Sequence, residues 1–316
     1  MASIGLPHQS NRIFAIDGGI ETWLMYKNGF TLEHFSAFHL LNDATGAEAI
    51  RRYYREHATV ARDRGIPYIF DSLTYRASRD WGNLLGYSAE GLAEINRRSL
   101  ALYHEIADEL GMDPETTLYG GCIGPRGDAY ETNQMITEAE AEEYHAVQVE
   151  TYAAAGADFV TGLTFKLVPE AIGLARAAKR AGIPSVISFM LERDGLVGGT
   201  LKLKDAIAAV DAATGAAPAY YMINCTHPQD FLPALEAAPW MKRIRGLRAN
   251  ASSLEHGELC QLGHLDEGDA DDLARHHGRL RRDFPHINVF GGCCGTDALH
   301  VGKILAAVQP ERAVAF

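Results

Sequence analysis

Three cysteines at the ends of two apolar segments carry the strongest chemical signal in this sequence. Cys225 follows residues 220–224, and the pair Cys293-Cys294 follows residues 288–292. Cysteine thiolates are preferred ligands of Zn²⁺, and the small residues beside them let a metal and a ligand approach the backbone. Three protein ligands with an open fourth position are typical of a catalytic zinc, which can bind an added thiol as its thiolate.

The two adjacent cysteines are unusual for a packed core. Successive side chains of a strand face opposite ways, so neighbouring cysteines rarely both enter one core. Gly291, Gly292 and Gly295 flank the pair and give the backbone the freedom to turn both thiols toward one point. Core packing or a disulfide between the neighbours is the alternative. Cys122 and Cys260 stand alone, and we interpret each as a small buried hydrophobic residue.

Short apolar segments alternate with longer amphipathic segments along the whole chain. The expected strands are residues 13–19, 68–75, 117–124, 157–165, 184–191, 220–226, 244–251 and 287–292. The expected helices that follow them are residues 47–64, 89–110, 138–155, 168–181, 204–214, 230–238, 269–283 and 297–308. Several of these helices end at a glycine, which is a common stop signal.

This alternation predicts an α/β protein with a single (β/α)8 barrel, or TIM barrel, as one domain over residues 1–316. A doubly wound sheet is the second choice, because the glycine-rich phosphate loop that usually opens such a fold is missing. Catalytic residues of a barrel lie at the C-terminal ends of its strands, so the three cysteines would share one rim. The long intervals 21–46 and 127–137 would cover that rim as lids.

The composition limits the partners of the chain. It is 47% hydrophobic and 22% charged, which is ordinary for a globular protein, and its net charge of −12 argues against nucleic acid or an anionic membrane as a partner. No run approaches the length of a membrane span, and residues 1–12 lack the apolar centre of a signal peptide. Five cysteines without a secretion signal indicate a reducing, cytoplasmic location. The sequence does not decide whether the protein forms a homo-oligomer.

Two cysteine motifs together resemble the homocysteine S-methyltransferase family. They are Asn224-Cys225-Thr226-x-Pro228 and Gly291-Gly292-Cys293-Cys294-Gly295-Thr296. That family consists of zinc-dependent TIM barrels that move a methyl group from a sulfonium, betaine or folate donor to the thiol of homocysteine. The resemblance covers nearly the whole chain, and it also includes Asp17-Gly18-Gly19 with Thr22 and Leu24, Ser72-x-Thr74-Tyr75, Gly124-Pro125 and Asn250.

The resemblance implies roles for individual residues. Cys225, Cys293 and Cys294 would bind zinc, while Asp17 and the backbone of Gly18 would hold the amino-acid end of a thiol substrate. A carboxylate can pair with an ammonium group, and glycine amides can bind a carboxylate. Without the resemblance, an aspartate in this position is as well explained by a helix cap or a loop contact.

Three further residues receive roles in the same way. Thr74 and Tyr75 would be walls of the substrate pocket, although Tyr75 fits equally well as an aromatic residue that packs the barrel. Asn250 would either orient the metal site from behind the ligands or only fix its own loop.

The chain departs from the family pattern after the expected fourth strand. Leu163 stands where the family has a glutamate that binds the substrate ammonium. Leucine cannot pair with an ammonium group, and the lost partner costs about 1.5–3 kcal/mol. The acceptor is therefore either homocysteine held by Asp17 alone or a different thiol without an α-amino group. Arg126, which follows Gly124-Pro125, either contacts an anionic substrate group or lies at the surface.

The expected donor is small, because the barrel uses all 316 residues and leaves none for a cobalamin or folate module. Sulfonium compounds or a betaine fit this limit, and aromatic side chains can bind such cations. The candidates on the two long intervals are Trp23, Tyr26, Phe30, Phe35 and Tyr130.

We therefore expect a zinc-dependent S-methyltransferase that converts homocysteine to methionine, with a small-molecule thiol and a methyl donor as its partners. One alternative is a methyltransferase for a thiol that lacks an amino group, and a second is a non-catalytic zinc-binding barrel. A zinc hydrolase is a third, but such enzymes usually use histidine ligands, and the 13 histidines here are scattered.

Overall fold

Eight parallel strands form a closed barrel in this computed structural model, which describes residues 4–130, 135–254 and 256–309. Around the barrel the strands lie in the order β1, β10, β9, β8, β5, β4, β3, β2. Their bounds are β1 Phe14–Ile16, β2 Tyr68–Phe70, β3 Thr117–Ile123, β4 Phe159–Phe165, β5 Ser185–Phe189, β8 Tyr220–Asn224, β9 Ile244–Ala249 and β10 Val289–Gly292. The closed barrel confirms the predicted (β/α)8 fold and excludes a doubly wound sheet, which is open.

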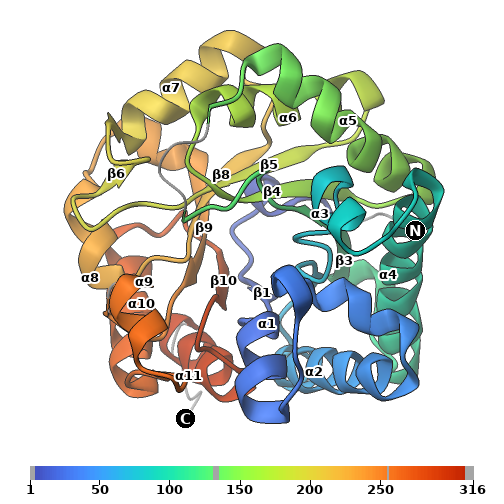
Figure 1. The fold of residues 1–316 in the computed structure, drawn as a ribbon. Coiled ribbons are helices and arrows are strands. Elements are labelled where there is room, and N and C mark those ends of the chain that lie inside the picture. The colour runs from blue at the N-terminus through green and yellow to red at the C-terminus, as the bar shows by residue number, and fades with distance from the viewer. Residues whose placement is uncertain (1–3, 131–134, 255, 310–316) are drawn as a thin grey trace.

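The helices surround the strands, as Figure 1 shows. The longer ones are α2 Ala44–Arg62, α4 Ala89–Glu109, α5 Glu138–Ala155, α6 Val168–Ala181, α7 Leu203–Thr214, α10 Ala270–Asp283 and α11 Ala298–Val308. The shorter ones are α1 Ile20–Thr22, α3 Arg79–Leu84, α8 Pro228–Phe231 and α9 His256–Gln261. A two-stranded hairpin of β6 Leu196–Val197 and β7 Leu201–Lys202 joins β5 to α7.

Local sequence signals place the ends of several helices. The side chain of Thr137 accepts a hydrogen bond from the backbone of Glu140, and the Glu140 side chain accepts one from the backbone of Thr137, so α5 begins with a capping box. Helices α5 and α6 end at Gly156 and Gly182, whose φ angles are +83° and +72°. Glycine adopts this left-handed conformation without strain, which is why both helices end where the sequence predicts.

The predicted sixth helix, residues 230–238, is wrong. The structure has the short helix α8 followed by a 3-10 turn over Leu232–Ala234. Pro233 lies in this segment, and proline cannot donate the backbone hydrogen bond that would continue an α-helix. The predicted second strand is too long for a related reason: it ends at Phe70, and Ser72 has a φ of +86°, which a strand cannot contain.

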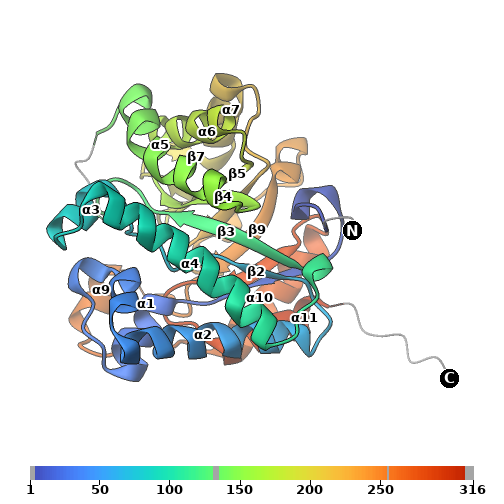
Figure 2. The same ribbon diagram turned by 90° about the vertical axis from the view of Figure 1, so that its right-hand side faces the viewer.

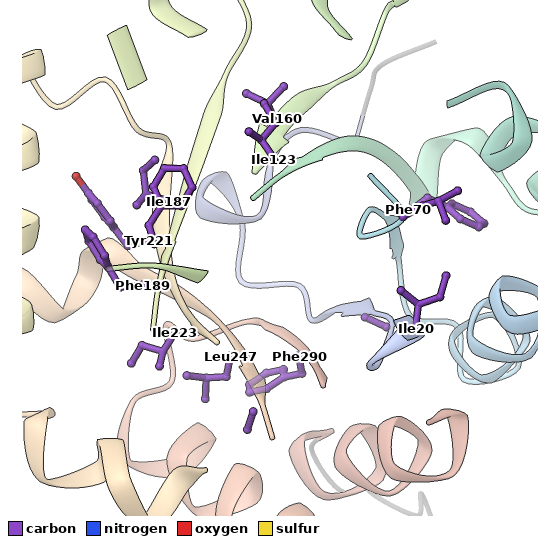
Figure 3. Close-up of a cluster of buried hydrophobic side chains, with 14 of the residues drawn as sticks. Ile20, Phe70, Ile123, Val160, Ile187, Phe189, Tyr221, Ile223, Leu247 and Phe290 are labelled. Atoms are coloured by element: carbon purple, nitrogen blue, oxygen red, sulfur yellow. The ribbon is translucent and has the colours of Figure 1, made fainter. Parts of the chain in front are cut away.

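The strands pack on both faces, with side chains that alternate in direction. Nine residues form a core cluster inside the barrel: Phe14, Ile16, Ile69, Leu118, Phe159, Val186, Tyr220, Met222 and Val289. Their neighbours along the strands, such as Phe70, Ile187 and Phe290, belong to the larger cluster between the barrel and the helices, part of which Figure 3 shows. Burial on both faces leaves the strand ends as the place for a site.

One end of the barrel carries the segments that follow the strands. In Figure 2, the short helices α1, α3 and α9 lie together at the left-hand end of the barrel. The described residues contain no helix with the length and apolar content needed to cross a membrane.

A buried histidine gives the fold a defined pH dependence. His57, on α2, is fully buried, and its Nδ1 lies 2.8 Å from the carbonyl oxygen of Tyr53. Burial lowers the pKa of His57 from 6.5 to about 4. The unfolded chain therefore binds a proton near pH 6.5, whereas the folded chain resists protonation until about pH 4. Stability from this residue is complete above pH 6.5 and is lost as the pH falls toward 4.

Between pH 7 and pH 4.5, we expect His57 alone to lower the free energy of unfolding by about 2 kcal/mol. The variant His57→Gln cannot titrate at this position. Its free energy of unfolding, measured by urea titration with circular dichroism, should therefore lack this loss of about 2 kcal/mol over the same pH range. His264→Gln, at an exposed position, is the control for loss of a histidine. An identical pH profile for His57→Gln and the unaltered protein would contradict this explanation.

Candidate metal centre

The three predicted zinc ligands meet at one point of the barrel rim. The Sγ atoms of Cys225, Cys293 and Cys294 all lie within 4.8 Å of one another. Cys225 follows the last residue of β8, and the other two follow the last residue of β10. Cys293 is only 8% exposed, and Cys294 is partly buried. Two strand ends thus bring three thiols into one small volume.

The backbone of Cys225 is held in an uncommon conformation. Its φ is +53°, a left-handed value that costs a cysteine conformational energy. Two hydrogen bonds fix it: the backbone N–H of Cys225 donates to the carbonyl of Arg248 (3.0 Å), and Nδ2 of Asn250 donates to the carbonyl of Cys225 (3.0 Å). Asn250 thus contacts the peptide of a predicted ligand directly. These contacts turn the Cys225 side chain toward the other two.

The Cys293-Cys294 turn is held from the neighbouring strand ends. The N–H of Cys293 donates to the carbonyl of Ala249 (2.8 Å), and the carbonyl of Cys294 accepts from the N–H of Ala251 (3.0 Å). A Cβ atom at Gly19 would collide with the carbonyl of Cys293, so a residue with a side chain would displace this turn. The glycine after β1 thus allows the ends of β1 and β10 to approach closely.

The sulfur chemistry fits a zinc site in the reduced protein. Cys225 and Cys293 form a disulfide in the structure, and Cys294 is a free thiol, so the disulfide does not join the adjacent pair. Burial raises the pKa of the Cys294 thiol to about 12, and a nearby cation is what would keep such a thiol ionised. Three sulfur ligands favour Zn²⁺ over Mg²⁺ or Mn²⁺. Reduction of the disulfide must precede metal binding, because the metal ligand is the thiolate.

Two cavities border the cysteines. All three line a narrow cavity together with side chains of several strand ends, including Glu21, Tyr75, Arg76, Leu163 and Arg248. Cys225 and Cys294 also border a larger cavity of about 630 Å³, whose wall includes Lys166, Glu192, His227 and Asn250. The cluster therefore lies where two separate molecules can approach it.

Asp17 follows β1, as the sequence predicted, but its side chain is bound by other residues of the protein. It is fully buried, and its Oδ1 accepts hydrogen bonds from Nη2 of Arg248 (2.7 Å) and from Oγ of Ser72 (2.6 Å). Burial raises the pKa of Asp17 to about 7, although Arg248 acts to lower it. Asp17 is not on the wall of the narrow cavity, whereas Gly18 is. A carboxylate that already has a buried arginine partner is poorly placed to bind a substrate ammonium.

Sequence reasoning missed three charged residues of this site: Glu21, Arg76 and Arg248. Glu21 lies on α1, and burial raises the pKa of its carboxyl group to about 7. It lines the narrow cavity, so an acidic group does face the cysteines, but from a different strand end than in the family pattern. The only signal in the sequence was the charge of these residues, beside motifs that we noted for other reasons.

The remaining predicted substrate residues divide into two groups. Tyr75 and Leu163 line the narrow cavity. Thr74 does not, because it is 1% exposed and its Oγ1 donates to the carbonyl of Cys122 (2.9 Å). Cys122 itself is 1% exposed, as expected for a core residue, whereas the side chain of Cys260 lies outside the described part of the chain.

Of the aromatic residues on the long intervals, Phe35 and Tyr130 line the narrow cavity. Trp23 is buried in the core against Tyr53, and Tyr26 is 50% exposed. Phe30 packs against the core, and the interval that carries Tyr130 includes residues 131–134, which lie outside the described residues. Arg126 forms a surface ion pair in which its Nε lies 2.8 Å from Oδ2 of Asp80.

Known proteins resemble this chain over most of its length. A family model described as homocysteine S-methyltransferase matches residues 14–308. Betaine–homocysteine S-methyltransferase 1 of Rattus norvegicus is 22% identical over 294 residues, which cover 84% of this chain and 65% of the rat protein. Methionine synthase of Mycobacterium tuberculosis is 25% identical over 333 residues, which cover 97% of this chain and 26% of that protein. The chain thus spans 65% and 26% of the lengths of these two relatives.

Solved structures share the fold. The oxidized form of the homocysteine methyltransferase MmuM from Escherichia coli superposes with a TM-score of 0.74 at 19% identity, covering 96% of this chain and 99% of that one. The metallated form of the same protein gives a TM-score of 0.69 at 18% identity, covering 93% of this chain and 96% of that one.

We expect the reduced protein to bind one zinc ion, because the three thiols lie close enough to share one metal. Replacing Cys294 with alanine should release most of it, since two sulfur ligands remain. The zinc content of each protein after dialysis, measured by inductively coupled plasma mass spectrometry, tests this prediction.

The matched control is Cys122→Ala, at a buried cysteine that lies away from the cluster. It should retain zinc to the same extent as the unaltered protein. Loss of zinc from Cys122→Ala, or its retention by Cys294→Ala, would show that the ligands are not the three cysteines at the rim.

Proposed function

The chain belongs to the homocysteine S-methyltransferase family, and from this membership we propose that it transfers a methyl group from a small sulfonium or betaine donor to the thiol of homocysteine, giving methionine. The observation that carries the proposal is the meeting of Cys225, Cys293 and Cys294 between two cavities. We further propose that the cysteines bind zinc and that the protein works in the reducing cytoplasm, where the thiols stay free of disulfides.

The two cavities suit the two substrates. We assign the acceptor to the narrow cavity, because all three cysteines line it, and the donor to the larger one. Phe35 and Tyr130 lie on the wall of the narrow cavity, and Tyr130 also borders the larger one. The face of an aromatic ring attracts a cation, so Tyr130 is placed to contact a sulfonium or ammonium donor.

The reaction is a direct displacement at the methyl carbon. The three cysteines would hold zinc, whose positive charge would lower the pKa of the acceptor thiol toward neutral pH. The bond from the acceptor sulfur to the methyl carbon forms as the bond from that carbon to the donor sulfur or nitrogen breaks. The donor leaves as a neutral thioether or tertiary amine, and the thiol proton passes to solvent. The walls of the two cavities align the reacting atoms, which is the main contribution of the protein.

Glu21 takes over the task that Leu163 cannot perform. Both residues line the narrow cavity, so a carboxylate and the leucine face the same acceptor. Asp17 binds Arg248 and Ser72 through its Oδ1 and is not on the cavity wall, which leaves Glu21 as the acidic group that lines the cavity. We assign the α-ammonium of homocysteine to Glu21. This keeps homocysteine as the acceptor although the family glutamate is absent.

A methyl-transfer assay tests the activity. The reduced, zinc-loaded protein should form methionine from homocysteine with at least one of S-methylmethionine, S-adenosylmethionine, dimethylsulfoniopropionate and glycine betaine. Product is measured by mass spectrometry, with the double variant Cys293→Ala/Cys294→Ala as the inactive control. A zinc-loaded protein that gives no methionine with any of these donors would disprove the assignment.

The variant Glu21→Gln should raise the KM for homocysteine about 10-fold or more, because a charged hydrogen bond to the ammonium is lost. It should leave the KM for 4-mercaptobutyrate, which has the same carbon skeleton but no amino group, nearly unchanged. Glu33→Gln, at an exposed position on the same long interval, is the control. Equal losses for both thiols would mean that Glu21 only supports the fold of the site.

A further inference from the structure

A buried arginine with unused hydrogen-bond donors lines the acceptor cavity. Arg76 lies in the turn between β2 and α3, is only 6% exposed, and shares the cavity wall with the three cysteines. Its Nη2 lies 2.9 Å from Oδ2 of Asp128. Neither Nε nor Nη1 has a partner among the described residues. Arginine stays protonated at every physiological pH, so these donors belong to a permanent charge.

The arginine is held in place by packing. Its guanidinium carbon lies 3.7 Å from the centre of the Trp81 ring, which puts the charged group against the indole. A cation stacked in this way keeps its N–H groups at the edge of the guanidinium, where an oxyanion can accept them. The Asp128 contact uses one nitrogen only. The side chain is therefore fixed before any ligand arrives.

A buried hydrogen-bond donor without a partner costs free energy unless a ligand accepts its hydrogen bond. A buried N–H without a partner loses the hydrogen bond that water would have given, and the loss is larger for a charged group. Arg248 also lines this cavity, but its Nε and Nη2 already bind Asp17, Ser72 and the carbonyls of Gly18 and Gly292. Arg76 is thus the cation with more donors left for a ligand.

Homocysteine carries a carboxylate that can accept hydrogen bonds from the free N–H groups of Arg76. Resting on the function proposed above, we propose that Arg76 binds the carboxylate of the acceptor thiol, so that the enzyme selects thiols that carry a carboxylate. A donor such as a betaine also carries a carboxylate. We assign the site to the acceptor because Arg76 lines the narrow cavity and is not part of the wall of the larger one. With Glu21 at the ammonium, both ends of an α-amino acid then have a partner.

Three thiols of the same length separate the two charges of homocysteine. Homocysteine carries both groups, 4-mercaptobutyrate carries only the carboxylate, and 3-aminopropanethiol carries only the ammonium. Binding of each to the reduced, zinc-loaded enzyme without a donor is measured by isothermal titration calorimetry. We expect 4-mercaptobutyrate to bind roughly 10-fold or more tightly than 1-propanethiol, which has neither charged group, as a charged hydrogen bond would give. Equal affinities for 4-mercaptobutyrate and 1-propanethiol would overturn the proposal without any variant.

Substitution of Arg76 then shows whether this residue causes the preference for thiols with a carboxylate. Arg76→Met should weaken binding of homocysteine and 4-mercaptobutyrate roughly 10-fold to 100-fold and leave 3-aminopropanethiol unchanged. Arg76→Lys, which keeps the charge, should recover part of the loss, and Arg126→Met is the control at a surface arginine. Zinc content and thermal unfolding of each variant show whether it is folded. A well-folded Arg76→Met variant that binds all three thiols like the unaltered enzyme would overturn the proposal.

Two further results separate this proposal from the proposed function. If no thiol binds the zinc-loaded enzyme, the proposed methyltransferase function fails, and the proposed role of Arg76 fails with it. If thiols bind and react, but Arg76→Met raises the KM of a carboxylate-bearing donor and not that of the acceptor, the function stands and the assignment of Arg76 to the acceptor is overturned.

Discussion

A buried ion pair between Arg248 and Asp17 fixes the strand ends that form the site. From the end of β9, the Arg248 side chain donates to Asp17 after β1, to Ser72 after β2 and to the carbonyl of Gly292 on β10. Its own carbonyl accepts from the N–H of Cys225 after β8. Removing one partner of such a buried pair leaves an uncompensated charge and costs about 3–5 kcal/mol. The positions of all three cysteines therefore depend on this ion pair, whose arginine also lines the narrow cavity.

The same contact changes how charge is distributed around the substrate. Asp17 is paired with Arg248 and is not on the cavity wall, and Leu163 offers no charge. Besides Arg248, the charged groups on the cavity wall are Glu21 and Arg76, which lie in the segments that follow the first two strands. In the function that we propose, the cysteine cluster binds zinc, while Glu21 and Arg76 recognise the acceptor. The proposed metal ligands thus match the family motifs, whereas the proposed substrate residues lie outside them.

The sequence predicted the barrel and the three cysteines because both rest on local patterns. Strand and helix periodicity, the glycines that end α5 and α6, and adjacent cysteines between glycines are visible without a structure. The sixth helix failed because Pro233 interrupts an otherwise helical pattern. Arg248, Arg76 and Glu21 could not be assigned, because a charged residue in a sequence does not show whether it will be buried or which distant residues it will contact. Thr74 matched a motif, but only the structure shows that it bonds Cys122.

The most direct test of this account is X-ray absorption at the zinc edge, measured on the reduced protein before and after addition of homocysteine. The account predicts three sulfur neighbours at about 2.3 Å from zinc in the protein alone and a fourth when the thiol is present. The Cys122→Ala variant should give the same two results. A spectrum dominated by nitrogen or oxygen neighbours, or a sulfur count that the thiol does not change, would contradict a three-cysteine centre that receives the acceptor.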